Sequence, residues 1–182
     1  MSKSARDGAD VEALLIGGRS GAGKSTVARE VSAQLAGAGV AHCLIEGDNL
    51  AEVHPAPPGD PHRSALTAAN LAAVWRNNAA AGYRRLVYTN TVSVLESEWV
   101  VTAIGSPTRL IRVLLTATDA TAAKRLGQRE RGTELAIHLE RSARAAARLD
   151  AEVRADVVRI ATDSRSVAHI AADIVSATGW LS

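Results

Sequence analysis

Residues 13–26 read ALLIGGRSGAGKST, and this stretch constrains the rest of the chain. It begins with a short apolar run that ends in glycine, which predicts a buried β-strand. After residue 24, apolar side chains recur every four positions, which predicts an α-helix. The segment between them, residues 18–25, matches the pattern G-x-x-x-x-G-K-[ST] without departure. A strand that passes through such a loop into a helix predicts a site for the phosphates of a nucleoside triphosphate.

The residue types of this loop each have a chemical reason to be there. Gly18, Gly21 and Gly23 allow backbone turns that direct several N–H groups at one anion. Lys24 supplies a positive charge for the β- and γ-phosphates, and Ser25 offers a hydroxyl to Mg²⁺. The predicted nucleotide-binding residues are therefore Gly18, Ser20, Gly21, Ala22, Gly23, Lys24, Ser25 and Thr26.

The remainder of the chain alternates apolar strands with helical patterns. Further strands are predicted at 41–46, 85–89, 111–117 and 157–161. This alternation predicts an α/β fold, in which a five-stranded parallel sheet is covered by helices on both faces as a three-layer α/β/α domain. We expect ligands to bind beyond the carboxyl ends of its strands.

Local signals set the predicted ends of the helices. Ser64 is expected to cap one helix, and Thr118 or Asp119 to cap another that runs toward Arg131. Residues 54–63, HPAPPGDPHR, hold four of the five prolines and predict an irregular loop. Loops of this length inside a compact domain are often functional.

Composition limits the class of protein. The 182 residues fit a single domain, which we place at 11–182 after a flexible lead-in at 1–10. A net charge of +2 is too small to predict a nucleic-acid partner. The single cysteine excludes an intrachain disulfide and favours a cytoplasmic location. No run approaches the roughly 18 apolar residues of a membrane span, so no membrane partner is expected.

Other marks of phosphate-loop proteins are missing. The sequence has neither the N-K-x-D motif of GTPases nor the L-S-G-G-Q signature of transport ATPases. Ring-forming motors carry an acidic residue at the end of an apolar strand, whereas the strand RLVYT is followed by Asn90. These absences argue against all three classes.

Asp48 is a candidate for a residue that takes part in the reaction. It lies in LIEGDNL, just after the second predicted strand. If that strand neighbours the first one in the sheet, Asp48 stands beside the phosphate loop. A carboxylate there either accepts a proton from a substrate hydroxyl or holds water on Mg²⁺. The alternative is that Gly-Asp-Asn is a plain turn.

Residues 14–50 resemble adenylyl-sulfate kinases. GRSGAGKST is similar to their G-L-S-G-[SA]-G-K-[ST]-T loop, and IEGDNL to their L-D-G-D-N-[VL] segment. The resemblance implies the P-loop kinase fold, ATP and Mg²⁺ as cofactors, and Asp48 facing the substrate. Gluconate kinases and chloramphenicol phosphotransferases share the same plan. Ala51 replaces the family's arginine, and no K-G-F-T-G segment follows, so the resemblance does not extend to the family's substrate.

A basic segment later in the chain resembles the lid of small P-loop kinases. KRLGQRER, residues 124–131, is similar to the R-L-x-x-R segment of gluconate, shikimate and adenylate kinases. Arg125 and Arg129 are four residues apart and share one helix face. Two guanidinium groups on that face predict a clamp on the transferring phosphoryl group, within a lid around 120–133.

Together these features predict an ATP-dependent phosphotransferase that acts on a hydroxyl of a small molecule. The predicted catalytic residues are Asp48, Lys24, Arg125 and Arg129, with Ser25 as the Mg²⁺ ligand. Alternatives are a nucleoside or nucleotide kinase, a polynucleotide end kinase and a non-catalytic ATP-binding regulatory module. Candidates for the acceptor pocket are the proline-rich loop, Asn90 and the polar residues Thr67, Asn70 and Asn77. The sequence predicts neither the acceptor nor the oligomeric state.

Overall fold

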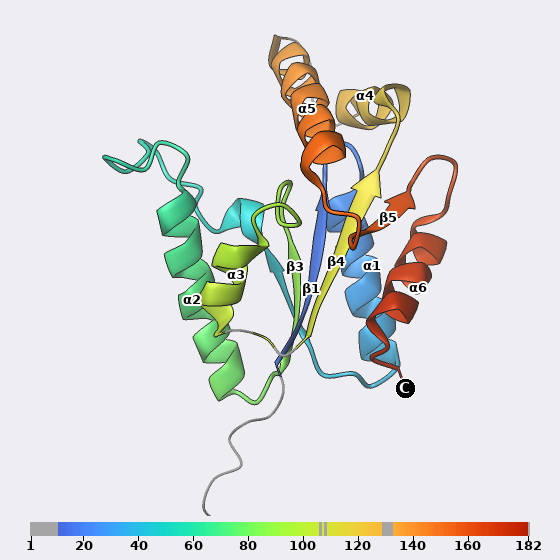
Figure 1. Cartoon of the computed structure of the whole chain (residues 1–182). Helices are drawn as coiled ribbons and strands as arrows, with labels where there is room; N and C mark the ends of the chain where they lie inside the picture. The colour runs from blue at the N-terminus through green and yellow to red at the C-terminus, as the bar shows by residue number, and fades with distance from the viewer. Residues whose placement is uncertain (1–10, 106, 108, 129–132, 182) are drawn as a thin grey trace, which may run out of the picture.

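Five strands form one parallel sheet in the order β2-β3-β1-β4-β5 (Figure 1). The structure is a computed structural model that describes residues 11–105, 107, 109–128 and 133–181. The strands are β1 (Glu12–Gly18), β2 (Cys43–Glu46), β3 (Arg85–Thr89), β4 (Arg109–Thr116) and β5 (Val158–Ala161). The predicted α/β fold with a five-stranded parallel sheet is confirmed.

Helices cover both faces of the sheet. Their bounds are α1 (Lys24–Gly37), α2 (Ser64–Ala80), α3 (Ser97–Ile104), α4 (Asp119–Gly127), α5 (Thr133–Glu152) and α6 (Val167–Thr178). Figure 1 shows α1 and α6 on one face, α2 and α3 on the other, and α4 and α5 beyond the carboxyl ends of the strands. The space at those carboxyl ends is therefore bordered by the phosphate loop below and by α4 and α5 above.

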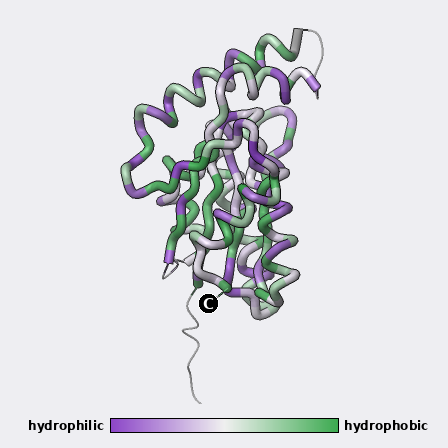
Figure 2. The backbone as a smooth tube through the Cα atoms, turned by 90° about the vertical axis from the view of Figure 1, so that its right-hand side faces the viewer, coloured by the Kyte–Doolittle hydropathy of each residue, from purple (hydrophilic) through white to green (hydrophobic). Residues whose placement is uncertain are grey.

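The central strand β1 separates two aliphatic cores. Leu14 and Ile16 face α1 and α6, while Ala13 and Leu15 face α2 and α3, and all four side chains are fully buried. A strand buried on both sides reads as a continuous apolar run, which is why ALLIG shows no polar alternation. Figure 2 shows the same pattern as a hydrophobic interior of strands under more polar outer segments.

The position of β2 corrects one premise of the sequence analysis. The second strand does not neighbour the first, because β3 lies between them and pairs with both. Asp48 therefore emerges one strand further from the phosphate loop than expected. The carboxyl ends stay level across this part of the sheet, since Thr89 of β3 pairs with Ile16 of β1 and with Glu46 of β2.

The turn after β2 is held against β3 by close packing. Gly47 opens a 3-10 turn (Gly47–Asn49), and a Cβ atom added to it would overlap the hydroxyl and ring of Tyr88. Tyr88 is fully buried, and its ring also makes an edge-to-face contact with Trp99 at 6.0 Å between centroids. Only glycine fits this position, so the backbone that carries Asp48 lies directly on the sheet.

Several predicted boundaries match the structure and others differ. β3 coincides with the predicted 85–89, and Thr118 caps α4 by accepting from the N–H of Thr121 at 3.2 Å. The second strand is shorter than predicted, beginning at Cys43. The helix after Thr118 does not continue toward Arg131 but ends at Gly127; residues 129–132 lie outside the described part of the chain.

The predicted cap of α2 is wrong. Ser64 is the first residue of the helix, and its N–H donates to Asp60 at 2.8 Å. The other carboxylate oxygen of Asp60 accepts from the N–H of Leu66 at 3.1 Å. Asp60 therefore satisfies two of the open N–H groups at the helix start and complements the positive end of its dipole.

Replacing Asp60 by alanine should destabilise the fold by about 1 kcal/mol, because two helix N–H groups lose their acceptor. Ser64→Ala is the matched control, since the Ser64 side chain makes no cap bond, and it should change stability by only a few tenths of a kcal/mol. Urea unfolding of both variants measures the difference. A larger loss in Ser64→Ala than in Asp60→Ala would contradict this assignment.

Candidate active site

The phosphate loop is shaped by glycines pressed against the sheet and α4. Gly21 has φ +84°, and a Cβ atom there would lie 2.8 Å from the carbonyl oxygen of Ala122. At Gly18, φ is +147° and a Cβ atom would lie 2.6 Å from the carbonyl oxygen of Leu115. Both positions thus require glycine for conformation and for space. The loop is fixed between β4 and α4, and α1 begins directly after it.

A polar cavity of about 550 Å³ opens in front of this loop. The loop contributes one wall, with Lys24 largely buried at the start of α1. The segment after β2 contributes the opposite wall, including Asp48 and Asn49. The lining residues are Ser20, Gly21, Gly23, Lys24, Ser25, Thr26, Arg29, Glu46, Asp48, Asn49, Leu126 and His138. The structure thus brings most of the residues singled out from sequence around one space.

The Asp48 side chain is open to this cavity and has a defined orientation. Its Oδ1 atom accepts a hydrogen bond from the side-chain nitrogen of Asn90 at 2.7 Å. The cavity walls displace part of the water around the carboxylate, and this desolvation raises the pKa of Asp48. The charge of Lys24 acts in the opposite direction and lowers it, while Glu46 raises it further. Asp48 therefore lies within the electrostatic reach of the phosphate-loop lysine.

Asn90 connects the acid to the strand that carries the loop. It follows β3, and its N–H donates to the carbonyl of Ile16 in β1 at 3.3 Å. Its side-chain oxygen accepts from the N–H of Val92 at 3.1 Å, which leaves the amide nitrogen to face Asp48. The sequence analysis placed Asn90 in the acceptor pocket but missed this bond, because it depends on the order of the strands.

Glu46 and Arg29 close one side of the cavity. The guanidinium of Arg29 on α1 donates to Glu46 at 2.8 Å, and both side chains line the cavity. The positive charge of Arg29 is thus already paired with the carboxylate of Glu46.

Arg125 is bound by protein oxygens of the phosphate loop and of the segment after β5. Its guanidinium donates to the carbonyls of Gly21 and Ala22 at 3.1 and 3.3 Å, and to the hydroxyl and carbonyl of Thr162 at 3.0 Å each. The side chain therefore fastens the phosphate loop to the segment after β5. Its role as a phosphoryl clamp stays a prediction, and Arg129 lies outside the described residues.

A second cavity, of about 290 Å³, lies behind the loop on the side of α6. Arg125 and Thr162 border it together with loop residues, and Val167 and Ile170 supply an apolar wall. Polar groups beside an apolar wall suit a flat, partly polar ligand group.

Arg19 is a buried cation that the sequence analysis missed. It occupies a variable position of the loop motif, and only 5% of its surface is exposed. Its Nε atom donates to the hydroxyl of Ser142 on α5 at 2.8 Å, and Nη1 forms an ion pair with Asp119 at the start of α4. The Ser142 hydroxyl donates in turn to the carbonyl of Ser20 at 2.8 Å. The contacts of Arg19 could not be predicted from the sequence, because the loop motif accepts any residue at this position.

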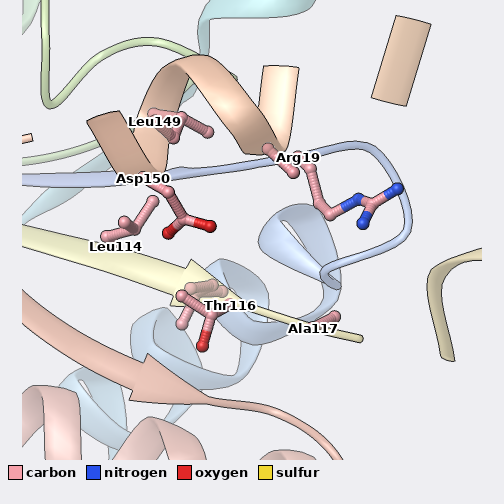
Figure 3. Close-up of a pocket in the computed structure, with 8 residues that line it drawn as sticks. Arg19, Leu114, Thr116, Ala117, Leu149 and Asp150 are labelled. Carbon is pink, nitrogen blue, oxygen red and sulfur yellow. The ribbon is translucent and has the colours of Figure 1, made fainter. Parts of the chain in front are cut away.

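A small crevice beside Arg19 separates α5 from β4. Figure 3 shows Leu149 and Asp150 of α5 near Leu114 and Thr116 of β4, with Arg19 on the adjoining loop. Its volume of about 40 Å³ is too small for a nucleotide or a sugar and holds at most a water molecule or two. We regard it as a packing gap.

A third cavity, of about 390 Å³, adjoins the first on the side of α2 and α3. Asn90 stands at the boundary, because it lines this cavity while its amide donates to Asp48 of the first. The other lining residues are His62, Ser64, Thr67, Val92, Glu96, Trp99 and Arg148. This space lies where a molecule presented to Asp48 would extend.

Two features are absent from the described part of the chain. Those residues contain no group of three or more histidine, cysteine, aspartate or glutamate side chains that could hold a metal ion. They also form no helix with the length and apolar composition needed to cross a bilayer.

Comparisons with known proteins give a family and a fold. A family model described as an AAA domain matches residues 14–152, about three quarters of the chain. A comparison with curated proteins finds no match.

Solved structures of small-molecule kinases share the fold. A gluconokinase from Sinorhizobium meliloti 1021 has 20% identity and a TM-score of 0.59, with 93% of each chain covered. A shikimate kinase from Acinetobacter baumannii in complex with shikimate has 15% identity and a TM-score of 0.58, with 92% of each chain covered. The Mycobacterium tuberculosis APS kinase has 18% identity and a TM-score of 0.50, covering 93% of this chain and 98% of that one. The suspected resemblance to P-loop small-molecule kinases is thereby confirmed at the level of the fold.

Arg19→Ala should lower the free energy of unfolding by about 2 kcal/mol, because a buried guanidinium with partners on α4 and α5 is lost. Arg29→Ala is the matched control. The Arg29 side chain is 70% exposed, against 6% for Arg19, so its ion pair should contribute less than about 1 kcal/mol. Urea unfolding compares the two variants. Equal losses would show that the Arg19 contacts do not anchor α4 and α5 to the loop.

Proposed function

This chain belongs to the AAA domain family, and we propose that it is an ATP-dependent phosphotransferase that moves the γ-phosphate to a hydroxyl group of a small molecule. The shared cavity carries the proposal, because Lys24 and Ser25 of the phosphate loop line it together with Asp48. Phosphoryl transfer requires mainly the positioning of two reactants and the stabilisation of charge. A cation, a hydroxyl and a carboxylate around one space meet those requirements.

In this proposal ATP lies along the loop. The backbone N–H groups of the loop and the start of α1 hold the phosphates, with Lys24 as the positive charge on the β- and γ-groups. The adenine occupies the cavity bordered by Arg125 and Thr162, which continues from the loop at Gly21 and Gly23. The amino end of α1 supports the placement of the phosphates, since it lines the cavity and its dipole favours an anion there.

The donor set around the loop also fits Mg²⁺. Ser25 offers a hydroxyl and Asp48 a carboxylate within the same cavity, and Mg²⁺ prefers such oxygen ligands while keeping several waters. We propose Ser25 as the direct ligand of the ion. When bound, the ion neutralises charge on the phosphates.

We propose Asp48 as the residue that orients the acceptor hydroxyl and takes its proton. The Asn90 amide holds one carboxylate oxygen, so the other is directed at the substrate. Desolvation raises the pKa of Asp48, which makes its carboxylate a better proton acceptor than an ordinary aspartate. In this proposal the acceptor oxygen lies between the carboxylate and the γ-phosphorus, as transfer requires.

We further propose that residues 11–182 act as one P-loop kinase-like domain with a lid around 120–133. Helices α4 and α5 lie beyond the carboxyl ends of the strands, where a lid would cover the bound nucleotide (Figure 1). Closure of such a lid excludes water, which would otherwise accept the phosphate. Arg19 of the loop contacts Asp119 of α4 and Ser142 of α5, which lie on either side of this segment in the sequence.

Purified protein with ATP and Mg²⁺ should release ADP faster when the correct acceptor is added. A panel of sugars, nucleosides, adenylyl sulfate and antibiotics tests this, with ADP measured in a coupled assay. Lys24→Ala should abolish the signal, because the charge on the phosphates is lost. Bound ATP without acceptor-dependent release across the panel would support the regulatory module instead.

Asp48→Asn should lower acceptor-dependent release by at least about 100-fold while ATP binding stays within a few-fold, because Asn90 keeps an oxygen acceptor but the base is lost. In the unmodified protein the rate should fall as acid protonates Asp48. Because the pKa of Asp48 is raised, this fall begins at a higher pH than for an ordinary aspartate. Rate measurements across pH check both points, and near-normal release by Asp48→Asn would refute the assignment.

A further inference from the structure

We infer that the acceptor is a neutral or positively charged hydroxyl compound that binds in the 390 Å³ cavity between α2, α3 and α5, a specificity that rests on the proposed function. The cavity adjoins Asp48 through Asn90, and its charges are arranged against an anionic ligand. Carboxylates and phosphates are thereby disfavoured as acceptors.

The position of the cavity follows from one hydrogen bond. Asn90 lines the cavity, and its amide donates to Asp48 at 2.7 Å. A molecule whose hydroxyl reaches Asp48 therefore has the rest of its body next to Asn90. A volume of about 390 Å³ falls within the range of sites for small molecules.

The lining favours a polar ligand with an apolar face. Ser64 and Thr67 of α2 offer hydroxyl groups, and Asn90 offers an amide. Trp99 of α3 adds a half-buried aromatic ring that is held edge-on against Tyr88. Hydroxyl and amide groups bind ligand hydroxyls, while an indole packs against C–H surfaces such as those of a sugar ring.

Among the described residues that line this cavity, Arg148 is the one arginine, and it is paired with two carboxylates. On Arg148 of α5, Nη1 lies 3.3 Å from Oε1 of Glu96, and Nε lies 3.1 Å from Oε2 of Glu152. Its charge is thus shared between two carboxylates, one of which also lines the cavity. Asp48 adds a carboxylate in the adjoining cavity, where Lys24 is the cation that acts on it.

Other arginines of this half of the chain are directed elsewhere. Arg63 donates to the carbonyl of Val53 at 3.2 Å. Arg76 lies twelve residues into α2, roughly 18 Å along the helix from Ser64. Arg84 and Arg85 precede or begin β3, at the opposite end of the sheet from the site. In the described part of the chain, these four arginines are not among the lining residues.

These charges decide between acceptor classes. A carboxylate or phosphate entering the cavity would meet Glu96 and Asp48 without an unshared arginine to bind it, and like charges in a partly desolvated site repel. An ammonium group would be attracted by the same carboxylates. A neutral polyol would lose little on desolvation, because hydroxyl and amide partners are present.

The test compares compounds of matched size and different charge. A sugar alcohol, its amino counterpart and its carboxylate counterpart are added with ATP and Mg²⁺, and ADP release is measured. In parallel, quenching of Trp99 fluorescence reports occupancy of the cavity, with Trp99→Phe as the control that should lose the signal. We expect the neutral or amino compounds to give both signals and the carboxylate to give neither.

The two readouts separate this inference from the proposed function. Quenching by the neutral or amino compound without any ADP release would keep the binding site and overturn the phosphotransferase proposal. Strongest release and quenching by the carboxylate compound would overturn the inference while the phosphotransferase proposal stands. Absence of quenching by all three compounds would also overturn the inference.

A charge variant tests the physical cause. Glu96→Gln removes the carboxylate that lines the cavity and should change affinities about two- to fivefold, down for the amino compound and up for the carboxylate compound. Glu98→Gln is the matched control, because it lies two residues further on α3 and is exposed. Thermal unfolding confirms that both variants are folded. An equal response of the two variants would overturn the role of Glu96.

Discussion

The hydrogen bond from Asn90 to Asp48 joins the two halves of the candidate site. The sheet order puts β3 between the strand that carries the phosphate loop and the strand that carries the acid. An aspartate on β2 reaches the loop only if the end of β3 leaves room for it and holds it. Asn90 does both, since its backbone is bound to Ile16 of β1 and its amide to Asp48. The strand that carries the phosphate loop, the acid and the cavity beside α2 and α3 meet around this one side chain.

The parts of the fold that could be predicted are those set by local chemistry. The loop motif, the strand at 85–89 and the cap at Thr118 each depend on residues near one another in the chain. Strand order is different, because it depends on how crossovers pack over the whole sheet, and the assumption that β2 neighbours β1 therefore failed. The prediction that Ser64 caps α2 failed for a related reason. Asp60 reaches the helix from inside a proline-rich loop whose path no periodicity describes.

The partners of the arginines could not be predicted from the sequence. Arg19, Arg125 and Arg148 are the same residue type, yet they bind different groups. Arg19 pairs with Asp119 inside the protein, Arg125 is bound by carbonyl oxygens of the loop, and Arg148 is shared by two glutamates. A guanidinium already bound to protein oxygens gives a ligand less than an unshared one. The chemistry available at the site is decided by these pairings. They form between residues 37 to 123 positions apart in the chain, except for the helical pair of Arg148 with Glu152.

The close packing of Gly47 on Tyr88 has a consequence for how this sequence can change over time. Any side chain at position 47 collides with the ring and hydroxyl of Tyr88, so position 47 is not free to vary while Tyr88 is kept. A smaller residue at 88 would admit a side chain at 47, but it would also remove the surface on which the Asp48 turn rests. Positions 47 and 88, which are 41 residues apart, should therefore covary among descendants of this chain. Sequences that keep both Gly47 and Tyr88 should also keep the position of the Asp48 turn.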